Sequence, residues 1–146
     1  MEYKKIRNIS VFTIYLVFVV YVVVFKTDLN ILFNNNVQRS VQLEPLYTIK
    51  SFYNAYVNGY IGPYFFYSNI LGNILIFIPF SFTLYMILNA TLSTIISFLF
   101  IVSIEFTQWI LKIGVFDVDD VILNMIGIII GLIICKLVFV YRRRHG

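Results

Sequence analysis

Apolar residues fill four long stretches of this chain, and short polar segments separate them. The stretches cover about residues 6–25, 64–88, 92–111 and 121–141. Each has roughly the 20 apolar residues that an α-helix needs to cross the hydrocarbon core of a bilayer. A segment inside a bilayer must satisfy its backbone polar groups internally, so each stretch is predicted to be a helix. The pattern therefore predicts an all-α membrane protein with four transmembrane helices.

A fifth, amphipathic helix is predicted between the first two transmembrane helices. From residue 46 to residue 60, apolar and aromatic side chains recur at helical spacing, and Lys50, Asn54 and Asn58 share the opposite face. A helix of this kind lies in the membrane interface. Interfacial anchoring is the favoured interpretation, and a lid over a pocket is the alternative. The apolar face consists of Ile49, Phe52, Tyr53, Tyr56, Val57 and Tyr60.

The composition supports one membrane domain over residues 1–146. The chain is 60% hydrophobic and 12% charged, and a soluble domain would have about twice that charged fraction. The single cysteine, Cys135, excludes a disulfide framework. The single histidine, His145, lies in the basic tail, so the nitrogen and sulfur ligands of a zinc enzyme are missing. The basic residues do not form a patch of the kind that binds nucleic acid.

The ends of the chain carry most of the positive charge. Lys4, Lys5 and Arg7 precede the first apolar stretch, and residues 142–144 are all arginine. Because Lys and Arg concentrate on the cytoplasmic side of membrane proteins, both termini are predicted in the cytoplasm. Residues 26–63 and 112–120 then lie outside. The apolar run 9–25 is too long for a signal peptide and is followed by no small-residue cleavage site, so the first helix is predicted to be retained.

Polar side chains recur inside three of the predicted transmembrane helices, where they are costly. They form pairs three or four residues apart, so the members of each pair share a helix face. From a rise of about 1.5 Å per residue, Glu105 lies roughly 9 Å below the outer end of its helix, and the others lie at similar depth. We therefore predict one outward-facing pocket. Its candidate ligand-binding residues are Asn69, Asn73, Glu105, Gln108, Asp117, Asp119, Asp120 and Asn124.

Each of these residues also has a structural interpretation. The amides can serve as hydrogen bonds that hold helices together. Asp117 and Asp119 can form a solvated turn, and Asp119 or Asp120 can cap the fourth helix near its positive dipole end. Glu105 fits a structural role least well. A carboxylate in the middle of a transmembrane helix needs a partner, a proton or a cation, and no Lys or Arg lies at its depth on another helix.

One stripe of the fourth helix continues from the pocket toward the cytoplasm. It contains Asp120, Asn124, Gly127 and Gly131, at steps of four, three and four residues. The two glycines form a GxxxG motif, which permits close approach of two helices. Helix packing is the predicted role of Gly127 and Gly131, and oligomerisation through the same motif is an alternative.

The polar residues and glycines described above fall in three motifs with a specific order and spacing. They are Asn69-x-x-Gly72-Asn73 ahead of Pro79, Ile104-Glu105-x-x-Gln108, and Phe116-Asp117-x-Asp119-Asp120 followed by Asn124, Gly127 and Gly131. Together they resemble the VanZ-like family of bacterial membrane proteins over about residues 39–141. Two departures stand out. Residues 42–46 read Gln-Leu-Glu-Pro-Leu where relatives often have Asn-Leu-Ile-Pro-Phe, and Gly114-Val115 stand where relatives often have Arg, a natural partner for the acidic turn.

The resemblance implies a multi-pass protein of the bacterial cytoplasmic membrane with a role in the cell envelope. The family's namesake is associated with reduced sensitivity to teicoplanin, a lipoglycopeptide antibiotic. Besides membrane lipids, the expected partners are the antibiotic, a peptidoglycan precursor or a lipid headgroup, bound in the pocket without a cofactor.

The alternative is a small membrane enzyme that acts on a lipid-linked substrate. Glu105 would be its general acid or base, and Asp117, Asp119 and Asp120 would hold Mg²⁺ or Ca²⁺. Binding is favoured over catalysis, because no nucleophile or phosphate-binding loop is evident and no arginine lies in the pocket. A third hypothesis, an ion pathway or transporter, would require an oligomer of four-helix chains.

Overall fold

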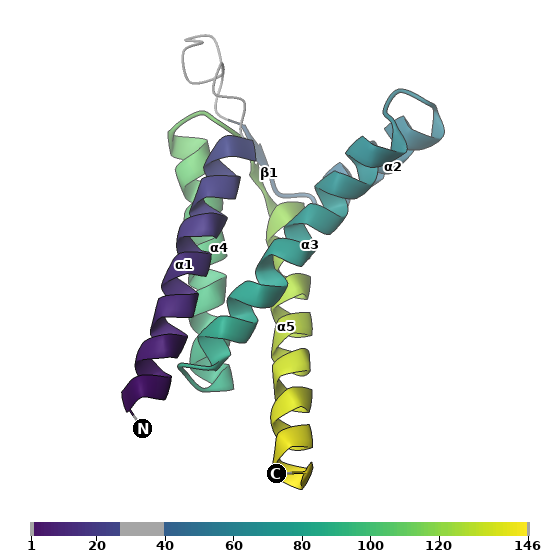
Figure 1. Ribbon diagram of the computed structural model, residues 1–146. Coiled ribbons are helices and arrows are strands. Elements are labelled where there is room, and N and C mark those ends of the chain that lie inside the picture. The colour runs from purple at the N-terminus through teal and green to yellow at the C-terminus, as the bar shows by residue number, and fades with distance from the viewer. Residues whose placement is uncertain (1, 27–39, 146) are drawn as a thin grey trace.

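The computed structural model describes residues 2–26 and 40–145, with side chains described over 2–22 and 40–141. These residues form five helices and two short strands (Figure 1). Four of the helices are long and apolar enough to cross a membrane, as predicted. Residues 27–39 of the predicted outer connection and the side chains of the basic tail lie outside the described part. The elements are α1 Glu2–Lys26, β1 Val41–Gln42, α2 Tyr47–Val57, α3 Pro63–Tyr85, α4 Ala90–Ile110, β2 Phe116–Asp117 and α5 Val118–His145.

The four long helices alternate in direction, so the two termini lie at the same end of the molecule (Figure 1). Helix α3 is central, because it contacts α1, α2, α4 and α5. The first half of α3 diverges from α1 and α4, and α2 lies along this diverging part (Figure 1). In the ribbon, α1 and α4 on one side and α2 with the first half of α3 on the other form the two arms of a fork at the end opposite the termini (Figure 1).

Helices α3 and α5 pack closely because of the GxxxG motif. Gly127 and Gly131 are both buried against α3. A β-carbon on Gly127 would overlap the carbonyl oxygen of Ile74, and one on Gly131 would overlap the carbonyl oxygen of Ile78. The hydroxyl of Ser81 donates a hydrogen bond to the carbonyl of Ile128 across this contact, at 3.1 Å. The motif thus joins two helices of the same chain.

The apolar core lies below the fork, between α1, α3, α4 and α5. Its buried residues are Val19, Phe77, Phe80, Leu84, Ile101 and Ile128. The ring of Phe80 stacks on that of Phe100 with centroids 4.9 Å apart. Helix α1 is also tied to α3 by polar contacts, since the hydroxyl of Tyr15 donates to the carbonyl of Ile76 at 2.8 Å. These contacts fix α1 beside the fork.

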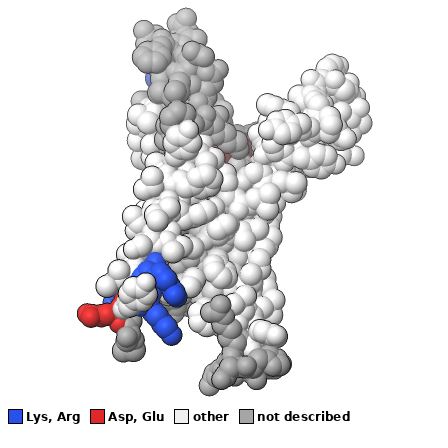
Figure 2. Space-filling model, in the orientation of Figure 1, with Lys and Arg blue, Asp and Glu red and all other residues white. Residues whose placement is uncertain are grey.

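Most other apolar side chains point outward, as expected of a protein surrounded by lipid. Figure 2 shows charged side chains gathered near the N-terminus and a broad uncharged surface above them. Together with the four long apolar helices, this surface is typical of a multi-pass membrane protein.

The two strands are an addition to the predicted all-α fold. β1 and β2 pair in parallel, with Val41 opposite Phe116 and Gln42 opposite Asp117. A two-residue strand leaves no periodicity in a sequence, so the pattern of apolar residues did not reveal it. The pairing holds the segment before α2 beside the start of α5.

Helix α2 lies within the 46–60 segment predicted to be helical, and none of its residues is buried. It packs on the first turns of α3 through aromatic rings. Phe52 stacks on Phe65 with centroids 6.0 Å apart, and Tyr56 stacks on Phe66 at 5.0 Å. The helix is therefore attached to α3 as one arm of the fork, and its place in a membrane interface stays a prediction.

Candidate functional site

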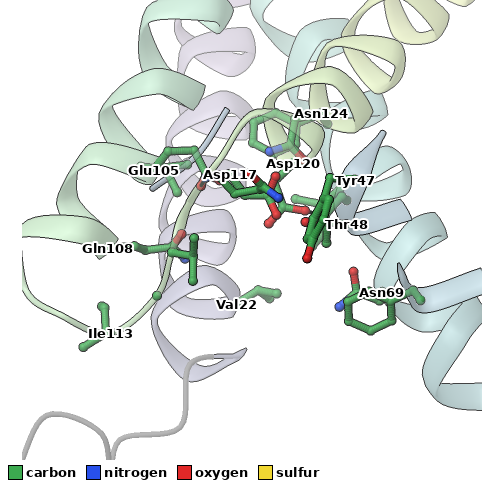
Figure 3. A pocket seen from close by; sticks show the side chains of 18 residues that line it. Val22, Tyr47, Thr48, Asn69, Glu105, Gln108, Ile113, Asp117, Asp120 and Asn124 are labelled. Carbon is green, nitrogen blue, oxygen red and sulfur yellow. Dashed lines mark hydrogen bonds between the residues drawn. The ribbon is translucent and has the colours of Figure 1, made fainter. Parts of the chain in front are cut away.

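A cavity of about 700 Å³ lies between the two arms of the fork, and Figure 3 shows the side chains that line it. Residues from every helix and both strands contribute to its wall. Most of the candidate ligand-binding residues meet there, and the exception is Asp119, which does not line the cavity. The candidates that line it are Asn69, Asn73, Glu105, Gln108, Asp117, Asp120 and Asn124.

The polar groups approach the cavity from different helices. In Figure 3, Glu105 and Gln108 of α4 lie on one side, Asn69 of α3 lies on the opposite side, and Asp117 and Asp120 lie between them. The rest of the wall is largely apolar. Its apolar residues are Val22, Phe52, Ile76, Phe77, Ile104, Ile113 and Val115.

Glu105 contacts the acidic turn. Its side chain is 2% exposed, and its Oε2 accepts a hydrogen bond from the backbone N–H of Asp117 at 3.4 Å. This contact joins the end of α4 to the start of α5. The mid-helix carboxylate thus meets a backbone donor, a partner that sequence spacing alone does not reveal.

Asp117 caps α5. Helix α5 begins at Val118, and Oδ1 of Asp117 accepts the backbone N–H of Asp119 at 2.9 Å. This is the usual geometry of an N-cap, in which the side chain satisfies a donor of the first turn. The prediction that Asp119 or Asp120 caps this helix was wrong, because the helix begins three residues earlier than the predicted start at residue 121.

Asp119 caps a different helix. It is fully buried, and its two carboxylate oxygens accept the backbone N–H groups of Leu46 and Ile49 at the start of α2. Leu46 is the N-cap residue of α2, and its own side chain makes no capping hydrogen bond. Asp119 therefore supplies the missing acceptor and a negative charge at the positive end of the helix dipole.

Asp120 joins α5 to α3. Its Oδ1 accepts a hydrogen bond from the side-chain amide of Asn73 at 2.5 Å. Neighbouring helix residues point in different directions, so Asp119 and Asp120 face different partners. The spacing of Asp120 and Asn124 on one stripe was the available signal that Asp120, and not Asp119, faces the cavity.

Asn124 has a buried oxygen without a partner. The side chain is 5% exposed and lines the cavity, and its Oδ1 accepts no hydrogen bond from the described residues. An unsatisfied buried acceptor costs about 1–3 kcal/mol. The cavity thus presents an acceptor that a donor group of a ligand would satisfy.

The charged groups among the described residues that line the cavity are all acidic. Three carboxyl groups line it, those of Glu105, Asp117 and Asp120, and the described lining residues include no Lys, Arg or His. Gly114 and Val115 also line it, so the position where relatives often carry arginine has no cation here. Among the described residues, no group of three His, Cys, Asp or Glu is placed to hold one metal ion.

The connection before α3 contributes residues that the sequence analysis did not select. Gln42, Tyr47, Thr48 and Phe52 line the cavity on the side of α2. The cap by Asp119 and the pairing of β1 with β2 bring this segment there. The helical spacing of the aromatic residues was the only sequence signal, and it favoured a role in the interface.

Comparisons with known proteins identify relatives of this chain. The VanZ/LLP1 family model matches residues 12–139. Protein VanZ of Enterococcus faecium is 31% identical over 137 residues, which covers 88% of this chain and 73% of that protein. No solved structure matches the chain. The family match includes all eight candidate residues and both glycines of the packing motif.

Proposed function

Because this chain belongs to the VanZ/LLP1 family, we propose that it is a cell-envelope protein of the bacterial cytoplasmic membrane that lowers sensitivity to teicoplanin-type lipoglycopeptide antibiotics. It does so by binding an amphiphilic molecule in the cavity of the fork. The bound molecule is the drug itself, a lipid or a lipid-linked peptidoglycan precursor.

The observation that carries this proposal is the composition of the cavity wall. Acidic and amide groups from α3, α4 and α5 converge on one space, and apolar residues of α1, α3 and α4 continue the wall beside them. A volume of about 700 Å³ is within the usual range of ligand sites. Such a wall suits a molecule with a polar head and an apolar body.

The orientation of the helices supports an extracellular ligand. The termini lie at one end of the molecule and the cavity lies toward the other (Figure 1). With both basic termini in the cytoplasm, the cavity faces the outer leaflet.

Binding fits the cavity better than catalysis. The described lining residues include no Ser, Cys, His or Lys. The hydroxyl groups among them are those of Tyr47 and Thr48, and a hydroxyl needs an adjacent base to act as a nucleophile. Both oxygens of Asp119 accept hydrogen bonds from α2, which leaves the acidic turn with fewer ligands for a catalytic cation.

The test is teicoplanin sensitivity in a strain that lacks the gene and carries a plasmid copy. The wild-type copy restores protection, whereas Glu105→Gln and Asp120→Asn do not. Glu44→Gln is the matched control, since Glu44 is exposed and does not line the cavity. Membrane levels of each variant are compared by immunoblot. Full protection by Glu105→Gln and Asp120→Asn would exclude the cavity from the function.

A further inference from the structure

We propose that the cavity recognises an uncharged sugar ring at the head of an amphiphile. This inference rests on the proposed function and names the chemical class of its ligand. Three properties of the wall carry it: the kind of side chain that lacks a hydrogen-bond partner, the placement of these side chains around the cavity, and the aromatic rings on the side of α2.

Amide side chains from three helices line the cavity without a hydrogen-bond partner among the described residues. They belong to Asn69 of α3, Gln108 of α4 and Asn124 of α5. The side chains of Asn69 and Gln108 make no hydrogen bond with another described residue, and the buried Oδ1 of Asn124 accepts none from them. Each amide has a carbonyl acceptor and an NH₂ donor. A ligand that completes all three must therefore both donate and accept hydrogen bonds.

Hydroxyl groups do both. A hydroxyl has one O–H donor and two acceptor lone pairs, whereas an ionised carboxylate only accepts and an ammonium group only donates. A sugar ring has several hydroxyl groups and no charge. Its hydroxyls can also donate to Glu105 or Asp120 beside the other interactions of these residues, because a carboxyl group has more than one acceptor site. The match therefore does not depend on whether these carboxyl groups are neutralised by other residues.

The hydrogen-bonding groups stand on opposite sides of the cavity. Figure 3 shows Gln108 on one side, with Asn69 and Thr48 on the other. A sugar ring has hydroxyl groups around its rim, so a single ring can contact both sides. A peptide instead presents its N–H and C=O groups in a regular row, which does not match amides that come singly from three helices.

Aromatic rings on the side of α2 also favour a sugar. Tyr47 and Phe52 of α2 line the cavity, and the ring of Phe52 is held in place by its stack on Phe65. The face of an aromatic ring carries partial negative charge, whereas the C–H groups on the face of a sugar ring carry partial positive charge. A sugar can therefore pack its C–H face on an aromatic ring while its hydroxyls reach the amides.

The apolar part of the wall favours a sugar that is attached to an alkyl chain. Val22, Ile76, Phe77 and Ile104 line the cavity beside the polar groups. An alkyl chain would bury its methylene groups against these residues, which is favourable in proportion to the apolar area buried. A free sugar forgoes this contribution.

The test measures binding to the purified protein in phosphatidylcholine nanodiscs by scintillation proximity, with empty nanodiscs as the blank. Tritiated decyl glucoside and decyl galactoside are the two sugar probes. The competitors are decanol, a decyl oligoethylene glycol methyl ether that has only acceptors, decylammonium, decyl phosphate, N-decanoyl-glycylglycinamide as an uncharged peptide, and free glucose. We expect at least one sugar probe to bind about tenfold more tightly than every competitor, because several hydrogen bonds are lost in each of the others.

Three variants locate the binding. Gln108→Met, Asn69→Leu and Asn124→Leu each replace an amide by an apolar side chain of similar size. Each should weaken binding of the sugar probe about fivefold. Asn54→Leu is the matched control and should not, since Asn54 of α2 is exposed and does not line the cavity. Gln108→Met loses no side-chain hydrogen bond to the described residues, so it serves if Asn124→Leu folds poorly.

Four outcomes would overturn the inference. Decanol, the ether or a charged competitor binding as tightly as the sugar probes would exclude the sugar ring. Tighter binding of the peptide amide would replace the sugar by a peptide. Free glucose binding as tightly as the probes would exclude the amphiphile. Sugar binding that is unchanged in all three variants would place the sugar outside the cavity.

Two further outcomes separate this inference from the proposed function. If neither sugar probe bound while Glu105→Gln still abolished protection from teicoplanin, the sugar inference would fail and the proposed function would stand. If a sugar probe bound and was weakened by Gln108→Met, while Glu105→Gln and Asp120→Asn protected fully, the sugar site would stand and the proposed function would fail.

Discussion

Asp119 of α5 accepts a hydrogen bond from the backbone N–H of Ile49 in α2, at 3.1 Å. A carboxylate of one helix thus caps another helix that is 70 residues away in the sequence. The neighbouring Asp120 faces the cavity instead. One acidic turn therefore both holds α2 in place and supplies part of the cavity wall.

Asp119→Asn should loosen α2. An amide keeps one acceptor but turns its NH₂ toward a backbone donor, so one N–H group of α2 loses its partner. We expect a loss of about 1–3 kcal/mol in the local stability of α2 and faster amide hydrogen exchange over residues 46–57. Exchange in the α3–α5 contact should not change. Equal exchange rates in Asp119→Asn and the wild type would show that the cap does not fix α2.

Gly127→Ala and Gly131→Ala should destabilise the fold. In each case the added methyl overlaps a backbone carbonyl of α3, which a flexible side chain cannot relieve. Overpacking of this kind costs about 1–3 kcal/mol. Gly72→Ala is the matched control, because a β-carbon there meets no atom within 4 Å. Thermal unfolding in detergent should show lower midpoints for the first two variants only, and a midpoint drop in Gly72→Ala of the same size would contradict this account.

The hydrogen bond between Asn73 and Asp120 should appear as a coupling between α3 and α5. In a double-mutant cycle with Asn73→Ala and Asp120→Ala, we expect an interaction free energy of about 1 kcal/mol in unfolding. The two residues are joined directly by their side chains, so their effects should not add. Strictly additive losses would mean that the contact contributes nothing to the packing of these helices.

Asn124→Leu should abolish protection from teicoplanin without lowering the stability of the fold. The substitution removes a buried acceptor that has no partner among residues 2–22 and 40–141, and this removes a cost of about 1 kcal/mol or more. The variant should therefore unfold at the same temperature as the wild type or higher, while its protection from teicoplanin is lost. A site kept for a ligand commonly carries such a cost. A clear fall in the unfolding temperature would indicate that Asn124 serves packing.

Much of the helical architecture and of the cavity could be predicted from local patterns. The lengths of the apolar stretches predicted the four long helices. The four-residue spacing within each pair predicted that Asn69 shares a helix face with Asn73, and Asp120 with Asn124. These inferences depend only on the geometry of a helix. They do not depend on how the helices are arranged relative to one another.

The parts that were missed depend on tertiary contacts. The cap of Asp119 on α2 joins residues 70 or more positions apart, and no spacing rule links them. The parallel pairing of β1 with β2 involves two residues in each strand, too few for a period to be seen. Asp117 was assigned to a turn because the start of α5 was placed at residue 121, beyond the acidic residues that open the helix.

The central claim is that the cavity, and not the lipid-facing surface, holds the ligand. A photo-crosslinking amino acid at position 108 reports on the cavity, because Gln108 lines it. The same group at position 106 reports on lipid, because Phe106 of the same helix is 50% exposed. Crosslinked molecules from bacterial membranes are then identified by mass spectrometry.

We predict an amphiphile that is enriched at position 108 over position 106 and disappears when Glu105→Gln and Asn124→Leu are added. The same mixture of bulk lipids at both positions, unchanged by those substitutions, would contradict the account.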